Sequence, residues 1–174
     1  MITNYTITLR APEPEDVDSI YLWENSPEMP ACTLAAAPVS RHAIAEFVSA
    51  PGDIYSTGQM RLVIALCDPQ RTPIGMIDVA DYDSRNRHGF VSIYIASRYR
   101  RRGYGLMALV LLEEYLRDVV GTHQLLALVA YDNEASRALF KAAQYNTCGS
   151  LRSYLRRGPH YSDALLFQKL FPAS

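Results

Sequence analysis

The chain of 174 residues is long enough to bury one substantial core, and we expect a single domain over residues 1–174. Its composition, with 49% hydrophobic and 20% charged residues, is typical of a globular protein and excludes disordered and collagen-like classes. The net charge of −1 and a calculated pI of about 6.4 argue against a nucleic-acid partner.

Targeting and metal signals are also missing from the sequence. No apolar run approaches the roughly 20 residues of a membrane span, and the first residues, MITNYTITLRAPEPED, do not resemble a secretory signal. Cys32, Cys67 and Cys148 are widely spaced, and neither they nor the four histidines have metal-ligand spacing. We therefore expect a cytoplasmic protein without a membrane partner, with reduced thiols and no metal.

The first third of the chain predicts a strand followed by two helices. Thr6–Arg10 alternates as a strand does, and Glu13–Asp16 offers the start of a helix. Prolines bracket an expected loop at Met29–Ala37, after which Ser40 can cap a second helix. This part is acidic, with eight acidic and two basic side chains in residues 1–60.

The middle of the chain predicts three strands and a long helix. Arg61–Cys67 and Ile74–Val79 are apolar runs joined by a polar, proline-containing segment, which is typical of paired antiparallel strands. After a polar turn, Phe90–Ile95 predicts a third strand of this group. Gly103–Val120 has apolar residues at helical spacing, so this strand is expected to lead into a long helix.

The last third predicts a second strand–helix unit and a hairpin. Leu125–Ala130 is apolar throughout, as in a strand buried on both faces, and Asn133–Ala143 has helical character. Cys148–Arg156 and Ala164–Leu170 predict a C-terminal hairpin. The whole string predicts a mixed α/β (α+β) fold, with a central sheet of about seven strands and about four helices.

One segment predicts a phosphate-binding site: Arg100-Arg-Arg-Gly-Tyr-Gly105 lies between a predicted strand and the helix that follows it. Backbone N–H groups and the positive end of the helix dipole converge at a helix N-terminus, and glycine allows a phosphate to approach closely. The arginines would add positive charge. The alternative is that the glycines shape a tight turn and the arginines are a solvated surface run.

The spacing Arg100-x-x-Gly103-x-Gly105 resembles the pyrophosphate-binding signature (Q/R)xxGx(G/A) of the GNAT superfamily of N-acetyltransferases. Trp23-Glu-Asn-Ser-Pro27, the order of strands and helices, and Asn133-Glu-Ala-Ser136 extend the resemblance over nearly the whole chain. It is closest to the branch of ribosomal-protein and spermidine acetyltransferases. The resemblance implies a sheet that splays between its fourth and fifth strands, with acetyl-coenzyme A in the opening.

The resemblance also implies which residues bind the cofactor. The backbone of Ile93–Ile95 would pair with the pantetheine arm, Asn133 would hydrogen-bond that arm, and the helix with Ser136 and Phe140 would flank the thiol. Asn133 could equally be a helix cap, and the two roles are compatible. The full expected set is Ile93, Tyr94, Ile95, Arg100, Arg101, Arg102, Gly103, Tyr104, Gly105, Leu106, Asn133, Ser136 and Phe140.

The acid–base residues usual in this family are missing. A glutamate often follows the position of Gly89, where this chain has Phe90, and polyamine acetyltransferases carry a tyrosine where this chain has Phe140. Ser136 and Tyr94 are the catalytic candidates in their place, and either could instead have a structural role. Asp78, Asp81 and Asp83 are further candidates for a base. They could also be ordinary turn residues.

The predicted function is transfer of an acetyl group from acetyl-coenzyme A to a primary amine of a polyamine, an amino sugar or a protein N-terminus. Acidic N-terminal helices and the aromatic and acidic residues Tyr154, Tyr161 and Asp163 of the hairpin would suit a cationic acceptor. Two other functions fit: a non-catalytic acyl-coenzyme-A-binding module, and an interaction protein whose arginines contact an acidic partner. Sheet edges or the hairpin could support a homodimer.

Overall fold

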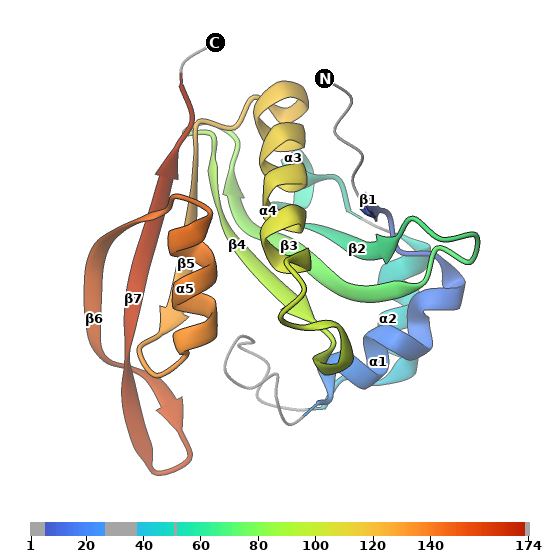
Figure 1. Cartoon of the computed structure of the whole chain (residues 1–174), viewed down its shortest axis with the longest axis horizontal. Coiled ribbons are helices and arrows are strands. Elements are labelled where there is room, and N and C mark those ends of the chain that lie inside the picture. Colours follow the sequence, from blue (N-terminus) through green and yellow to red (C-terminus); the bar gives the residue numbers. More distant parts are fainter. Residues whose placement is uncertain (1–5, 27–37, 51, 173–174) are drawn as a thin grey trace.

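A computed structural model of the chain describes residues 6–26, 38–50 and 52–172 (Figure 1). Within them, seven strands form one sheet in the order β1-β2-β3-β4-β5-β7-β6. The strands are β1 (Ile7–Arg10), β2 (Met60–Leu66), β3 (Pro73–Asp83), β4 (His88–Ile95), β5 (Gln124–Ala130), β6 (Asn146–Arg157) and β7 (His160–Leu170). The helices are α1 (Val17–Glu24), α2 (Arg41–Ser49), α3 (Ile54–Thr57), α4 (Tyr104–Tyr115) and α5 (Glu134–Ala142).

These elements confirm the predicted mixed α/β fold and differ from the predicted order by one helix. Helix α3 has four residues, too few for helical periodicity to be visible in the sequence. The predicted long helix ends as α4 at Tyr115, and a π-helical turn at Leu116–Val120 continues it. The expected loop at Met29–Ala37 lies outside the described residues.

The sheet opens between β4 and β5, as the resemblance implied. Among the strands of the described residues, this pair is parallel and the other pairs are antiparallel. Its register has three pairs, His88↔Gln124, Gly89↔Leu125 and Phe90↔Leu126, while β4 continues to Ile95 and β5 to Ala130. Figure 1 shows the two strands side by side at one end and diverging toward the start of α4.

Side-chain caps account for several of the boundaries that were predicted from sequence. Ser40 Oγ accepts a hydrogen bond of 3.1 Å from the N–H of Ala43 at the start of α2. Asn133 Oδ1 accepts one of 3.1 Å from the N–H of Ser136 at the start of α5. Each side chain satisfies a backbone donor that the first turn of a helix leaves without a partner. The cap at Asn133 is therefore present.

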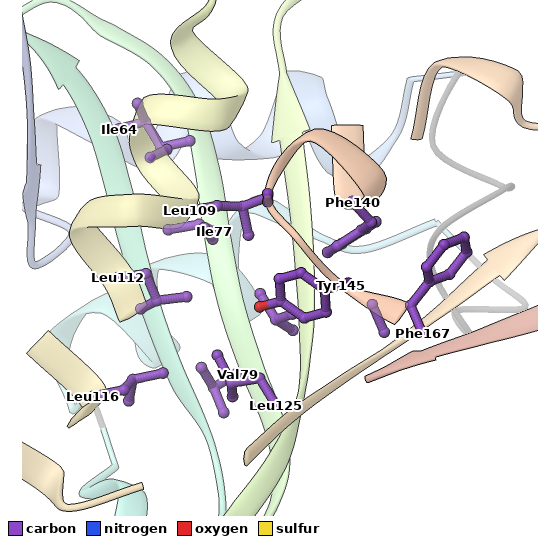
Figure 2. Close-up of a cluster of buried hydrophobic side chains, with 14 of the residues drawn as sticks. Ile64, Ile77, Val79, Leu109, Leu112, Leu116, Leu125, Phe140, Tyr145 and Phe167 are labelled. Atoms are coloured by element: carbon purple, nitrogen blue, oxygen red, sulfur yellow. The ribbon is translucent and has the colours of Figure 1, made fainter. Parts of the chain in front are cut away.

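Helices cover both faces of the sheet and bury a core on each. One core lies between the sheet and helices α4 and α5, and contains Leu109, Leu112, Phe140 and Phe167 (Figure 2). The other lies beneath α1 and α2 and includes Ile20, Trp23, Ile44 and Met76. Strand β4 contributes to both, because its side chains alternate between the two faces.

A buried polar cluster joins α4 to the end of α5. Lys169 of β7 lies with its Nζ 2.5 Å from Glu113 Oε2 of α4 and donates a hydrogen bond of 2.8 Å to the carbonyl of Ala143, just after α5. Burial raises the pKa of Glu113 although Lys169 opposes the rise. Lys169 thus links the C-terminal half of α4 to the end of α5.

Candidate active site

A cleft of about 970 Å³ lies where β4 and β5 have separated. Its walls are the C-terminal half of β4, the loop that leads to α4, and the first turns of α4 and α5. The lining residues are Ile93, Tyr94, Ile95, Ser97, Tyr99, Arg100, Arg101, Gly103, Tyr104, Gly105, Leu106, Asn133, Glu134, Ala135, Ser136 and Leu139. Apart from Arg102 and Phe140, every residue expected at a cofactor site lines this one cleft.

The start of α4 gives the cleft its backbone donors. Gly103 is the N-cap, with φ of 81° and ψ of −6°, a left-handed conformation that glycine adopts without strain. The amides that follow it belong to the first helical turn, where N–H groups lack carbonyl partners within the helix. Together with the helix dipole they favour an anion at this end.

Gly105 lets α4 and α5 come close together beside the cleft. A Cβ atom at this position would lie 3.3 Å from Leu139 Cδ2 of α5, which is tighter than an ordinary van der Waals contact. Because the first turns of both helices line the cleft, their positive ends act on the same space. The motif residue Gly105 therefore shapes the cleft through helix packing.

The three motif arginines have different surroundings. Arg100 lines the cleft, donates a 2.7 Å hydrogen bond from Nε to the carbonyl of Ile95, and lies over the ring of Tyr94. Arg101 also lines the cleft and has a φ of 61°, an uncommon conformation for a residue with a side chain. Arg102 is exposed and does not line the cleft.

Helix α5 presents Asn133, Ser136 and Leu139 to the cleft, while Phe140 lies in the core. The ring of Phe140 is 2% exposed, with its centroid 5.1 Å from that of Tyr145 and 6.0 Å from that of Phe167. Leu139 and Phe140 are both about one turn after Ser136, so spacing alone cannot say which faces the ligand. Burial of the larger aromatic ring in the core decides it.

Several cleft residues were not expected from the sequence: Ser97, Tyr99, Glu134, Ala135 and Leu139. Ser97 and Tyr99 belong to a short 3-10 turn, Ser97–Tyr99, that carries the chain from β4 toward α4. The position of Ser97 and Tyr99 between β4 and α4 could have indicated these two residues, because a connection between two walls of the cleft must border the cleft. Leu139 carried no such signal.

A second cavity of about 350 Å³ lies on the other face of the sheet. Helices α1 and α2 and strands β2, β3 and β4 surround it. Its lining residues are Glu24, Val39, Ala43, Ile44, Phe47, Gln59, Met60, Arg61, Asp78, Val79, Ala80 and Ser92. Ser92 belongs to β4, next to Ile93 of the cleft, so the same strand borders both cavities.

A buried triad of charges lines this second cavity. Arg61 Nη1 lies 2.6 Å from Glu24 Oε1, and its Nε and Nη2 donate to the two oxygens of Asp78 at 2.8 and 2.9 Å. The Glu24 side chain is 7% exposed, and the other two are 21% exposed. Burial opposes the charge of Arg61, yet the two carboxylates raise its pKa above the ordinary value. The triad keeps one net negative charge.

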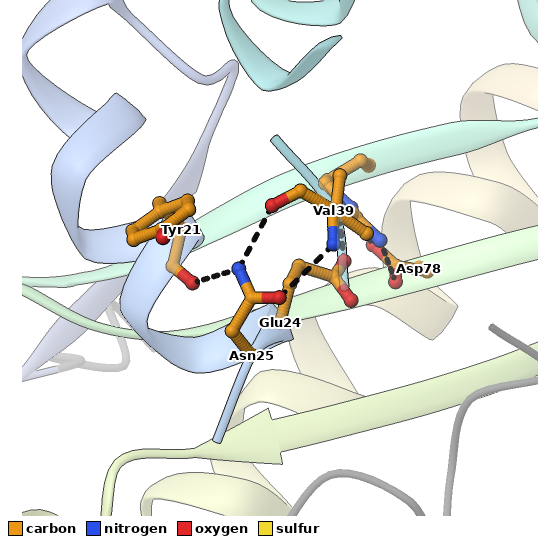
Figure 3. Close-up of polar contacts among 6 residues, drawn as sticks. Tyr21, Glu24, Asn25, Val39 and Asp78 are labelled. Carbon is orange, nitrogen blue, oxygen red and sulfur yellow. Dashed lines mark hydrogen bonds and ion pairs between the residues drawn. The ribbon is translucent and has the colours of Figure 1, made fainter. Parts of the chain in front are cut away.

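Asn25 fixes the wall of this cavity beside the triad (Figure 3). Its side-chain amide donates to the carbonyls of Tyr21 and Val39, at 2.9 and 3.0 Å, and its oxygen accepts from the N–H of Val39 at 3.0 Å. The two hydrogen bonds with Val39 hold the end of α1 against the residues that lead into α2, and the bond to Tyr21 caps α1 itself.

The structure separates the acid–base candidates. Phe90 is in the last β4–β5 pair, where the cleft begins. Asp78 is held by Arg61, and Asp81 is exposed. Asp83, the last residue of β3, accepts hydrogen bonds from the backbone and side chain of Asn86, which lower its pKa and tie it to the turn that follows. Ser136 and Tyr94 line the cleft.

The hairpin residues expected near an acceptor line neither of the two cavities. Tyr154 and Tyr161 are 52% and 60% exposed. Asp163 accepts a 2.8 Å hydrogen bond from the N–H of Ser153, at the point where the β6–β7 register shifts. Asp163 thus stabilises an irregularity in β6.

Within the described residues there is neither a metal-ligand group nor a membrane-spanning helix. Among residues 6–26, 38–50 and 52–172, no three His, Cys, Asp or Glu side chains are grouped as a metal site would require. In the same residues, every helix is too short or too polar to cross a bilayer.

Solved structures with the same arrangement include two acetyltransferases. A ribosomal L7/L12 alpha-N-protein acetyltransferase, RimL, in complex with coenzyme A has 15% identity and a TM-score of 0.84, over 100% of this chain and 98% of its own. Spermidine N-acetyltransferase from Vibrio cholerae in complex with coenzyme A and spermine has 21% identity and a TM-score of 0.83, over 96% of both chains. At these identities the likeness shows the fold.

Sequence comparisons gave one family match. A search of curated protein sequences found no significant match. The family model described as an acetyltransferase (GNAT) domain matches residues 6–146, which include the Arg100–Gly105 motif and all of α5. A match over this share of the chain, together with the opening between β4 and β5, identifies an acyltransferase, and the chain belongs to the GNAT acetyltransferase family.

Proposed function

We propose that this protein transfers an acetyl group from acetyl-coenzyme A to a primary amine by direct attack of the amine on the thioester. The observation that carries the proposal is the cleft between β4 and β5, which the first turns of two helices and two arginines line. The coenzyme A complexes of structurally similar acetyltransferases support the choice of cofactor.

The residues of the cleft fit the parts of acetyl-coenzyme A. The first-turn amides of α4, with Arg100 and Arg101, suit the charged pyrophosphate, and the backbone of Ile93–Ile95 suits the amides of the pantetheine arm. That stretch of β4 lies beyond its last pair with β5. Asn133 would hydrogen-bond the arm as well as cap α5. When bound, the cofactor supplies an activated acetyl thioester.

We propose that the acceptor amine approaches from the second cavity, because strand β4 borders both this cavity and the cleft. The triad, whose formal charges sum to −1, suits a cationic amine. A polyamine, an amino sugar or a protein N-terminus fits this description. Structurally similar enzymes are named for spermidine and for a ribosomal protein N-terminus.

The reaction needs a neutral amine and an outlet for the thiolate. Deprotonating a lysine-like amine at pH 7 costs roughly 4.6 kcal/mol, so a base or a chain of waters would raise the rate. As the amine nitrogen bonds the carbonyl carbon, the carbon–sulfur bond breaks and the sulfur takes up a proton. Ser136 is the proposed donor of that proton. A thiol of pKa about 8.5 also leaves tolerably without one.

A second candidate function is binding of acyl-coenzyme A without turnover. It is favoured by one observation, that apolar rings occupy the two places where this family often carries its base and its acid. Phe90 stands at the opening of the sheet, and Phe140 is buried in the core. Losing a positioned acid or base typically costs about 10²–10⁴-fold in rate, so the first function does not require them.

The test is acetyl-coenzyme-A-dependent thiol release with polyamines, amino sugars, amino acids and basic peptides, and with a control that lacks an acceptor. Turnover with one class of acceptor, and formation of the acetylated amine by mass spectrometry, would support transfer. Saturable binding of acetyl-coenzyme A without turnover on any acceptor would favour the binding module instead.

A further inference from the structure

Three side chains form a continuous contact from helix α1 to the loop before α4. The rings of Trp23 and Tyr94 have centroids 6.0 Å apart at an angle of 42°. The guanidinium carbon of Arg100 lies 5.4 Å from the centroid of Tyr94. Trp23 is 9% exposed and belongs to the core beneath α1 and α2, whereas Arg100 is exposed at the cleft. Tyr94 therefore lies between a buried residue of the core, Trp23, and an exposed arginine at the cleft, Arg100.

Two contacts from β4 fix the orientation of Arg100. Its Nε donates to the carbonyl of Ile95 at 2.7 Å, and its guanidinium lies over the ring of Tyr94. An arginine side chain in water samples many rotamers, and a ligand that fixes it must offset the lost entropy. Here the fold has already restricted the side chain at both contacts, on residues that themselves line the cleft.

We propose that Tyr94 is a positioning residue, whose ring, supported by Trp23, holds Arg100 in the orientation that binds the pyrophosphate of acetyl-coenzyme A. This inference rests on the proposed function. It gives Tyr94 a role in affinity for the phosphate end of the cofactor, in place of proton transfer at the thioester. The aromatic ring is required for this role and the hydroxyl is not.

The competing account is that Tyr94 only shapes the strand along which the pantetheine arm lies. The two accounts differ in which part of the cofactor depends on Tyr94 for its binding affinity. Acetyl-pantetheine has the same thioester and amides as acetyl-coenzyme A but lacks the pyrophosphate and the nucleotide. A role through Arg100 affects acetyl-coenzyme A alone, whereas a role in shaping β4 affects both compounds.

The experiment measures the affinity of both compounds by calorimetry, with competition for the weaker one, in wild type, Tyr94→Leu, Tyr94→Phe, Arg100→Met and the double variant Tyr94→Leu/Arg100→Met. We expect Tyr94→Leu to weaken acetyl-coenzyme A by about three- to thirtyfold, the range of a cation–π contact, and to leave acetyl-pantetheine unchanged. Tyr94→Phe should restore most of the loss. In the Arg100→Met background, Tyr94→Leu should cost nothing further.

Arg98→Met is the matched control. Arg98 lies over a neighbouring ring, 4.8 Å from the centroid of Tyr99, and is exposed in the same loop, but it does not line the cleft. Arg98→Met removes the same charge as Arg100→Met, but because Arg98 does not line the cleft it should weaken acetyl-coenzyme A binding less. Emission of Trp23, the one tryptophan of the chain, and the unfolding midpoint report whether each variant keeps its fold.

Three outcomes would overturn the inference: equal losses for both compounds in Tyr94→Leu, additive losses in the double variant, or a Tyr94→Phe variant as weak as Tyr94→Leu. These outcomes leave the proposed function intact, since wild type still binds acetyl-coenzyme A. If wild type binds neither compound, the proposed function fails and this inference fails with it. If Tyr94→Leu does not fold, Tyr94→Met, which keeps a long apolar side chain without the ring, replaces it in the same comparisons and is held to the same outcomes.

Discussion

The two cavities beside β4 are built in different ways. The cleft includes the N-termini of two helices and the C-terminal half of one strand, and its residues fall in two short stretches, 93–106 and 133–139. The second cavity depends on charged side chains from three separate elements, Glu24 of α1, Arg61 of β2 and Asp78 of β3. The residues of the cleft are thus local in the sequence, whereas the triad of the second cavity is assembled only by the fold.

The largest expected effect tests how much the second cavity depends on its charges. Arg61→Met leaves two buried carboxylates without their partner, and breaking a buried ion pair in this way typically costs about 3–5 kcal/mol of stability. Urea unfolding at pH 7 measures the loss. The loss should shrink as the pH falls, because protonation neutralises the stranded carboxylates.

The triple variant Glu24→Gln/Arg61→Met/Asp78→Asn is the control for this prediction, since it removes all three charges together. It should recover much of the stability that Arg61→Met loses. If the triple variant is as unstable as the single one, then packing of the Arg61 chain matters more than its charge.

The second prediction concerns acid sensitivity on the same side of the sheet. Asp16, 2% exposed just before α1, binds Arg10 through two hydrogen bonds of 2.6 and 2.8 Å. Burial raises the pKa of Asp16, but the hydrogen bonds from Arg10 and the Glu13 N–H outweigh it and hold the pKa below its usual range. A lowered pKa contributes stability above the unfolded value of about 3.9, which is lost as the pH falls through the folded value.

Asp16→Asn should therefore cost about 1.5–3 kcal/mol at pH 7, and the gap to wild type should close on acidification below about pH 4. Urea unfolding across this pH range checks it. A gap that stays constant with pH would mean that the carboxylate charge is not what stabilises the start of α1.

The third prediction tests the backbone character of the cleft. Gly103→Ala should weaken acetyl-coenzyme A by about ten- to a hundredfold, because the left-handed backbone is strained with a side chain and the methyl group occupies the approach to the α4 amides. Gly121→Ala is matched, since Gly121 also has positive φ, 76°, and both glycines have open space around an added Cβ.

The two glycine variants should lose similar stability, and only Gly103→Ala should lose affinity. Calorimetric titration with acetyl-coenzyme A and thermal unfolding separate the two effects. Equal affinities in the two variants would show that the start of α4 does not contact the phosphates.

The smallest expected effect is the relief of strain. Arg101 and Gln144 have φ of 61° and 66°, and glycine at either position should stabilise the fold by about 0.5–1 kcal/mol. Arg101→Gly should also weaken the binding of acetyl-coenzyme A about three- to tenfold, because the substitution removes a positively charged side chain from the cleft. Gln144→Gly should leave affinity unchanged. Stability that does not rise in either variant would mean that the left-handed residues are unstrained.

The features that could be predicted from the sequence are those set by residues close together in the chain. Most of the strand and helix order, the cap at Ser40 and the Arg100–Gly105 motif follow from local patterns, since periodicity, capping and glycine placement act over a few residues. The other expected cleft residues, such as Ile93–Ile95 and Asn133, came from the family resemblance. The Glu24–Arg61–Asp78 triad has no local signature, because its members meet only after α1 packs on the sheet. The inward rotation of Phe140 likewise depends on Tyr145 and Phe167.

The place of β7 in the sheet has a consequence for the order of folding. β7 follows β6 in the chain but inserts between β5 and β6, and its Lys169 joins α4 to the end of α5. The motif residues are synthesised before β7, and Lys169 can link α4 to the end of α5 only after this late strand docks. We expect nascent chains that stop before β7 to contain the complete phosphate-binding motif and still not bind acetyl-coenzyme A.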